Sequence, residues 1–176
     1  RQMCIRDRCT PEEIRAEAEI KTAAEELDRP LFAWSLTSGF VDTASGVVRD
    51  CPDPIDALTH VESIEGRCIV LLHDLGVLLE DKDPLLIRQL RDTLRHAKGE
   101  GKLLVLIGIW RPLPAELARE ITPIDLELPG REQLAEVVEG IQESASLNEV
   151  VSLESVIDAA SGLTTMEAEN ALALSV

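Results

Sequence analysis

The stretch RCIVLLHD (residues 67–74) is a continuous apolar run that ends in His-Asp and is too short for a helix. Such a run is typical of a strand that is buried on both faces, as in the parallel sheets of α/β proteins. A second run of this kind, KLLVLIGI, follows at residues 102–109. Together the two runs predict the centre of a parallel sheet that is covered by helices on both faces.

Helix-start signals separate the apolar runs. A capping residue followed by proline occurs at Thr10-Pro11, Asp53-Pro54 and Asp83-Pro84, and Glu13 would complete a capping box with Thr10. The alternation of helix and strand favours a three-layer α/β sheet with right-handed crossovers. We expect helices over 10–27, 53–64, 83–98 and 113–121, strands over 31–36, 67–74, 102–109 and 124–129, and a loop over 39–53.

The pattern changes after Pro129, where the strands stop and three helical segments follow at 130–145, 152–161 and 164–176. We therefore expect an α/β core over 9–130 and an incomplete, all-helical region over 131–176. The first eight residues, RQMCIRDR, match nothing in the later pattern, and we interpret 1–8 as a foreign, adapter-derived segment. On this interpretation the chain is a fragment of a longer protein.

The amino-acid composition limits which classes of binding partner are plausible for the chain. The formal net charge is −16, so nucleic acid is an unlikely partner, as is an anionic membrane surface. No apolar run approaches the ~20 residues that a membrane-spanning helix needs. The four cysteines form no CxxC pair, which favours reduced thiols in a cytoplasmic protein.

Asp74 is the first candidate site residue. Ligands of open α/β sheets bind at the carboxyl ends of the strands, where an acid can hold magnesium, as in the Walker B arrangement of ATPases. Asp74 is followed by Leu75 and Gly76, so a second, catalytic acid is missing. We keep Asp74 as a weak magnesium candidate and prefer the interpretation that it caps the strand.

A phosphate-binding loop is not visible in the sequence. The motif GxxxxGK[ST] must lie between a strand and the helix that follows it. The nearest string, GEGK (99–102), lies after a predicted helix and before a strand, and Leu103 follows its lysine. The start of the first helix, Cys-Thr-Pro-Glu-Glu (9–13), is anionic and contains no glycine. His73-Asp74 is not interpreted as an HD-type metal site, because His60 and His96 lie in predicted helices of an α/β fold.

Four arginines are further candidates. Arg88, Arg91 and Arg95 fall on one side of the third predicted helix. They could form a docking stripe for an acidic partner, an arginine finger, or a solvated face. We prefer the solvated face. Arg111 follows the strand 102–109 and would project from its carboxyl end towards Asp74. It is a candidate sensor of bound nucleotide.

The order of these segments resembles an AAA+ ATPase module. CIVLLHDLGVLLED (68–81) is similar to a Walker B strand, KLLVLIGI to the sensor-1 strand, and SGLTTMEAENALALS (161–175) to a helix of the lid. The chain resembles the N-terminal region of the AAA+ ATPases named for hypothetical chloroplast reading frame forty-six. The resemblance implies a degenerate first module, with an intact P-loop module downstream that binds and hydrolyses ATP with magnesium.

The expected fold is therefore a P-loop NTPase (AAA+) type sheet without a P-loop, followed by a partial lid. In such sheets the strand before the P-loop is central, and residues 3–6 would have to fill that position. We expect a non-hydrolysing module without a cofactor of its own. Its partners would be its own downstream AAA+ module, neighbouring subunits and an unknown protein client. The alternatives are a divergent ATPase domain that uses Asp74 and Arg111, and a stand-alone partner-binding domain.

Overall fold

A computed structural model describes residues 5–9, 12–108, 112–145 and 153–174 of the chain. The chain divides into two compact units, Arg1–Leu126 and Glu127–Val176. The boundary predicted from the sequence lay between residues 130 and 131. Each unit has its own elements and its own core.

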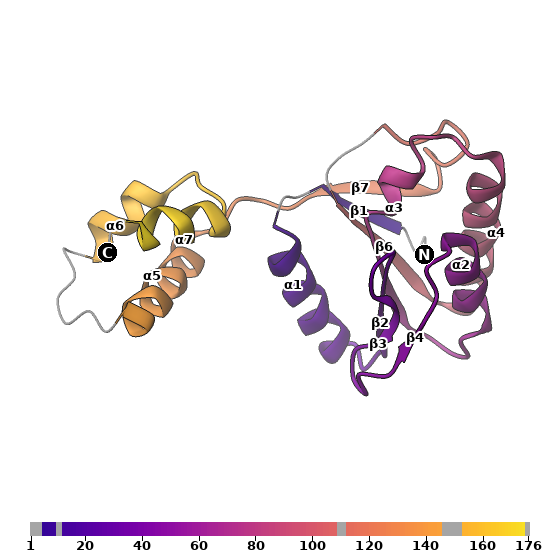
Figure 1. The fold of residues 1–176 in the computed structure, drawn as a ribbon, viewed down its shortest axis with the longest axis horizontal. Helices are drawn as coiled ribbons and strands as arrows, with labels where there is room; N and C mark the ends of the chain where they lie inside the picture. Colours follow the sequence, from indigo (N-terminus) through magenta and orange to yellow (C-terminus); the bar gives the residue numbers. More distant parts are fainter. Residues whose placement is uncertain (1–4, 10–11, 109–111, 146–152, 175–176) are drawn as a thin grey trace. The chain divides into compact units, whose positions relative to one another are not determined.

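The first unit is built on one seven-stranded sheet in the order β4-β3-β2-β5-β6-β1-β7 (Figure 1). Strands β2, β5, β6, β1 and β7 run parallel, whereas β2 pairs with β3, and β3 with β4, in antiparallel fashion. The strands are β1 Ile5–Cys9, β2 Leu31–Ser35, β3 Gly39–Asp42, β4 Val48–Arg49, β5 Ile69–His73, β6 Leu103–Gly108 and β7 Ile121–Asp125.

Helices cover both faces of the sheet, which gives the three layers expected from the sequence (Figure 1). One face is covered by α1 and the other by α2 and α4. The helices of this unit are α1 Glu13–Glu26, α2 Pro54–Ser63, α3 Leu75–Leu78 and α4 Pro84–Glu100.

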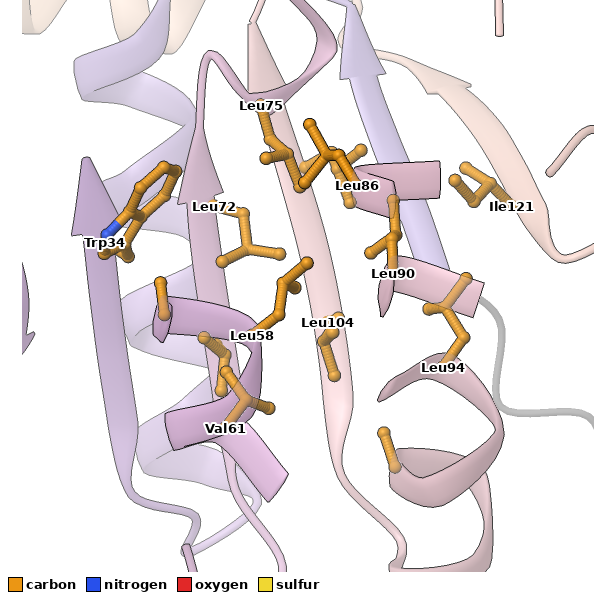
Figure 2. Close-up of a cluster of buried hydrophobic side chains, with 14 of the residues drawn as sticks. Trp34, Leu58, Val61, Leu72, Leu75, Leu86, Leu90, Leu94, Leu104 and Ile121 are labelled. Atoms are coloured by element: carbon orange, nitrogen blue, oxygen red, sulfur yellow. The ribbon is translucent and has the colours of Figure 1, made fainter. Parts of the chain in front are cut away.

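Alternation along the two central strands explains the layers, because successive side chains point to opposite faces of a sheet. Val70 and Leu72 of β5 pack against α2 and α4, together with Leu104 of β6 (Figure 2). Ile69 and Leu71 pack on the other face, in the cluster that contains α1. Every residue of β5 is buried. The prediction of a strand buried on both faces is confirmed.

Two of the three predicted helix starts are confirmed. Asp53 caps α2 by accepting hydrogen bonds from the backbone N–H groups of Ile55 and Asp56, and the Asp83 carboxylate accepts one from Leu85. In both helices proline is the first helical residue. The third start is different: α1 begins at Glu13, and its N-cap residue makes no side-chain capping bond. Thr10 and Pro11 lie outside the described residues.

The expected loop over 39–53 is wrong, because it contains the antiparallel strands β3 and β4. Phe40 is buried in the core next to Trp34, and this burial offsets the cost of ordering the hairpin. Gly39 has φ +68, and a Cβ there would lie 2.5 Å from the backbone oxygen of Arg49. Only glycine fits that position.

The predicted helix over 113–121 is also wrong. The chain forms turns between Ala115 and Glu120, and β7 then begins at Ile121, three residues before the predicted strand. Ile121 enters the core and pairs with Ile5 of β1. Pairing with a neighbouring strand therefore overrides the local helical pattern in this segment.

The strand expected from residues 3–6 is β1, which takes an interior position next to the edge, between β6 and β7. The strand runs over residues 5–9, whereas residues 3–6 and the middle of the sheet were expected. Backbone pairing requires an occupant at this position, because a missing interior strand would leave two neighbours with unpaired amides. The foreign origin of residues 1–8 stays a prediction.

The second unit consists of α5 Arg131–Ala145, α6 Leu153–Ala160 and α7 Thr165–Ala173. A small core joins its helices: Leu134, Ile157, Ala160 and Ala168 are all buried. The predicted capping box at the start of α7 is confirmed, because Thr164 and Glu167 exchange both of its hydrogen bonds.

Candidate functional site at the carboxyl edge of the sheet

Asp74 follows β5 directly at the carboxyl edge. Its backbone N–H donates a 2.9 Å hydrogen bond to Ile107, and its φ of 53° is in the left-handed region. Asp74 makes no side-chain hydrogen bond to the short helix α3 that it precedes. A Cβ at Gly108 would lie 3.2 Å from its Oδ1 atom, so glycine gives the carboxylate room beside β6. The strand therefore ends through the backbone of Asp74, and the carboxylate caps nothing among the described residues.

A cluster of two carboxylates and one imidazole lies beside Asp74. Glu13 and Glu17 are one turn apart on α1, and His73 is the last residue of β5. The Nδ1 atom of His73 lies 2.5 Å from Glu13 Oε1, and its Nε2 atom lies 3.3 Å from Glu17 Oε1. One potential ligand atom from each of the three residues lies within 4.8 Å of the others. We call these three residues the Glu-Glu-His cluster.

The cluster opens into a pocket of about 450 Å³ at the carboxyl edge. Ser35, Thr37 and Ser38 supply hydroxyl groups to its lining, and Trp34 and Asp74 complete the wall. The pocket therefore has polar walls and carries acidic groups on α1 and β5. Of the sequence candidates that the structure describes, only Asp74 lies here.

The cluster was not singled out from the sequence. Two glutamates four residues apart at the start of a helix are common on solvated faces, and a single histidine at a strand end is an ordinary packing residue. The available signal was positional: the strand His73 and the helix with Glu13 both meet the carboxyl edge of a parallel sheet. Only the order of the strands brings them together.

The arginine stripe of α4 does not act as one unit. Arg88 donates a 2.8 Å hydrogen bond to Asp92, and Arg95 lies 3.8 Å from the same carboxylate. Arg91 differs from both, because its Nε atom is buried and has no hydrogen-bond partner. Asp92 therefore neutralises much of the stripe and leaves Arg91 as its distinct member.

A second pocket, of about 620 Å³, lies between α4 and the segment 112–116. Arg88 and Arg91 line it with Ile87 and Leu113, so apolar and cationic groups share its wall. Arg95 is not part of this lining. Arg111 lies outside the described residues, so its predicted approach to Asp74 stays a prediction.

Lys102, the lysine of the GEGK string, has a structural role. It is buried, and its Nζ atom donates to the backbone oxygens of Val61 (3.0 Å) and Glu62 (3.2 Å) at the end of α2. Its ammonium group also lies 2.6 Å from Glu100 Oε2. These contacts engage the ammonium group of Lys102 at the amino edge of the sheet, whereas Asp74 lies at the carboxyl edge.

The side chains of two cysteines are described. Cys51 and Cys68 are free and buried. Burial raises the pKa of both thiols, and neighbouring acidic groups add to this effect at Cys51. Both are therefore poor nucleophiles at neutral pH. Within the described part of the chain, no helix combines the length and the apolar character needed to cross a membrane.

The strand order, the interior β1 between β6 and β7, and the carboxyl-edge pocket define the first unit as an α/β domain of the AAA ATPase class. Solved structures have the same fold. The AAA domain of FIGL-1, in a structure titled as a complex with ADP, gives a TM-score of 0.66 at 14% identity and covers 96% of this chain and 58% of that one. A structure titled for katanin self-assembly gives 0.64 at 13% identity, covering 96% and 55%.

The chain belongs to the family of SpoVK-like AAA ATPase N-terminal domains, whose model matches residues 9–126. It is 28% identical over 169 residues to an uncharacterized AAA domain-containing protein, ycf46, of Guillardia theta, covering 93% of this chain and 33% of that protein. The ycf46 protein of Trieres chinensis is also 28% identical, over 159 residues, covering 88% and 32%. The chain thus spans about a third of the length of these relatives. The resemblance and the fold class expected from the sequence are confirmed.

Proposed function

We propose that the chain is a non-hydrolysing AAA+-like module of a longer, cytoplasmic AAA+ ATPase. In this proposal its task is assembly or client binding, and an intact module downstream binds and hydrolyses ATP. The length of the ycf46 relatives, about three times that of the matched segment, supports this division of labour. The buried, unpaired thiols of Cys51 and Cys68 suit a reducing compartment.

The Glu-Glu-His cluster carries the proposal. P-loop proteins hold phosphates on backbone amides between a strand and the following helix, with a lysine to neutralise charge. In this chain the helix after the interior strand β1 is α1, and its first turns present Glu13 and Glu17 to the pocket. Two carboxylates in this position repel a triphosphate instead of attracting it.

The remaining groups do not compensate for this charge. Glu12, the N-cap of α1, is buried and paired with Arg15, so that arginine is already engaged by a carboxylate. Asp74 has the position of a magnesium-holding acid, but Leu75 and Gly76 follow it where a second acid would be needed. The donor set therefore does not fit ATP with magnesium, and we assign the chain no step in hydrolysis.

The pocket between α4 and 112–116 supports the assembly role. Half-buried arginines with unused donors are suited to carboxylates of a protein partner, because a guanidinium group binds a carboxylate in a bidentate manner. Arg91 is half-buried and lies beside Ile87 and Leu113, and its Nε atom makes no hydrogen bond. We therefore place the contact to the downstream module or to a neighbouring subunit on this wall.

The first test is nucleotide binding by the 176-residue chain, measured by calorimetry with ATP and with ADP in the presence of magnesium. We expect no binding at millimolar nucleotide. Binding that needs magnesium and is lost in Asp74→Asn, but not in the exposed neighbour Asp81→Asn, would overturn the proposal. That outcome would favour the divergent ATPase domain.

The second test is assembly with the downstream part of the same reading frame, followed by sedimentation velocity. We expect a complex that is weakened at least about tenfold by Arg91→Glu, since an unpaired charge then faces the partner. Arg95→Glu is the matched control on α4, because this side chain does not line the pocket. A reading frame without a downstream P-loop would favour the stand-alone binding domain and sink the proposal.

A further inference from the structure

The Glu-Glu-His cluster has the ligand atoms of a metal site. Two carboxylates one helical turn apart face one imidazole from a strand, a combination of oxygen and nitrogen ligands that proteins use for divalent transition metals. All three residues face the same pocket, which leaves room for water to complete the coordination. Asp74 lies on the wall of that pocket and adds to its negative charge.

The burial of His73 is an independent observation that indicates a ligand. The residue is 8% exposed, and its Nδ1 atom is fully buried and makes no hydrogen bond, although the Glu13 carboxylate lies 2.5 Å from it. A buried polar group without a hydrogen bond is costly and is uncommon in a folded protein. A metal ion is one partner that a ring nitrogen can bind.

The two glutamates are free to adjust. Their side chains are 49% and 46% exposed, and in the present arrangement they contact different nitrogens of the ring. A small rotation of one carboxylate is enough to bring both to the same side of His73, and half-exposed side chains rotate readily. Without an ion, two carboxylates next to each other repel, so a divalent cation relieves this repulsion.

We propose that Glu13, Glu17 and His73 form a binding site for one divalent transition-metal ion. A ligand set of two carboxylates and one imidazole favours Zn²⁺, Mn²⁺, Co²⁺ or Fe²⁺ over Mg²⁺ and Ca²⁺, which prefer oxygen ligands alone. The net charge of −16 raises the local concentration of cations around the whole chain. The site needs no nucleotide, and the inference does not depend on the assembly role.

The test uses the 176-residue chain without a histidine tag, stripped with a chelator and titrated with Mn²⁺ and Co²⁺ in the absence of nucleotide. We expect one equivalent to bind and to raise the melting temperature. The visible spectrum of the Co²⁺ form should lack a thiolate-to-metal band, which excludes Cys4, Cys9, Cys51 and Cys68 as ligands. Calorimetry gives the number of ions and their affinity.

Three variants assign the ligands. Glu13→Gln, Glu17→Gln and His73→Gln should each weaken binding at least about tenfold, since even the loss of an outer partner of a metal ligand commonly costs this much. Glu26→Gln is the matched control, because it removes an exposed carboxylate from the same helix. Circular dichroism verifies the fold of each variant, and the half-exposed Glu13 and Glu17 are the positions least able to disturb it.

Several outcomes would overturn the inference. Loose binding of several ions, unchanged in all three variants, would show adventitious association with an acidic surface only. A thiolate band would place the ion on cysteine. Binding that appears only with ATP and is lost in Asp74→Asn would identify a magnesium-nucleotide site, and would then also remove the proposed function. Metal binding without nucleotide, together with no ATP binding, supports both proposals separately.

Discussion

Two buried basic side chains lie at opposite edges of the same sheet and have opposite surroundings. Lys102 directly precedes β6 at the amino edge, and its ammonium group contacts two backbone oxygens and the carboxylate of Glu100. His73 ends β5 at the carboxyl edge, and its Nδ1 atom has no hydrogen-bond partner. They are 2% and 8% exposed, so burial alone does not distinguish them.

The two edges of the sheet differ in role: one stabilises the fold and the other is a candidate binding site. Buried polar groups that make their hydrogen bonds help to specify a structure. Buried polar groups that lack them tend to lie where a protein binds a ligand. Lys102 ties the end of α2 to the sheet and thereby stabilises the fold. His73 lines a pocket, and its Nδ1 atom makes no hydrogen bond. The comparison predicts that mutations at the two edges have different consequences for stability and for binding.

The largest effect is expected at the amino edge. Lys102→Met keeps most of the side-chain volume but removes the ammonium donor from the Glu62 carbonyl and one of the two donors of the Val61 carbonyl, which also accepts a 3.4 Å hydrogen bond from Ile64. We expect the free energy of unfolding to fall by about 2–4 kcal/mol, because unsatisfied buried acceptors cost about 1–3 kcal/mol each. Urea unfolding measures this. Lys98→Met, an exposed change on α4, is the control, and an equal loss in both variants would contradict the structural role.

Trp34 tests whether the carboxyl edge also contains satisfied polar groups. Its indole N–H donates a 2.8 Å hydrogen bond to the backbone oxygen of Cys51, and the side chain is buried. Trp34→Phe removes this donor and leaves a small cavity, so we expect a loss of about 1–3 kcal/mol in urea unfolding. A loss below about 0.5 kcal/mol would show that water replaces the donor and that this edge is more open than the structure indicates.

The central layers were predictable from the sequence because they follow from strong local patterns. The run 68–72 has no polar break, and the Asp-Pro pairs at 53–54 and 83–84 mark their helices by capping chemistry alone. The pairing of strands that are distant in the sequence was harder to predict. The hairpin β3–β4 depends on the burial of Phe40 against β2, and β7 begins at Ile121 because it pairs with β1.

The candidate site was the least predictable part for the same reason. Asp74 could be found because an acid after a buried strand is a recognised pattern. Glu13 and Glu17 are 56 or more residues away from His73 in the sequence, and nothing local relates them. The role of Lys102 was equally hidden, since its partners at the end of α2 are about 40 residues earlier.

His73 should show the reverse of the result at Lys102. His73→Leu removes a buried ring whose Nδ1 atom makes no hydrogen bond and whose carboxylate contacts, with Glu13 and Glu17, are to half-exposed side chains. The leucine is apolar and of similar size, so we expect the free energy of unfolding of the metal-free protein to change by less than about 1 kcal/mol. The stabilisation by Mn²⁺ should be lost. Urea unfolding with chelator and with Mn²⁺ measures both. A loss above about 2 kcal/mol without metal would show that His73 is a satisfied core residue.

The smallest effect is the pH dependence of the amino-edge ion pair. The hydrogen bond from Lys102 lowers the pKa of Glu100, and the positive charge of Lys102 adds to the effect. A carboxyl group with a lowered pKa in the folded state stabilises the fold above its ordinary pKa, and this contribution is lost as the pH falls through the lowered value. The free energy of unfolding should therefore decrease more steeply between about pH 5 and pH 3 in the wild type than in Glu100→Gln.

All other carboxylates titrate in both proteins, so the difference between the two profiles isolates Glu100. In a Lys102→Met background the difference should shrink, because the main cause of the shift is gone. Parallel profiles in both backgrounds would mean that solvent screens this exposed carboxylate completely, and that the two carbonyl groups alone hold Lys102.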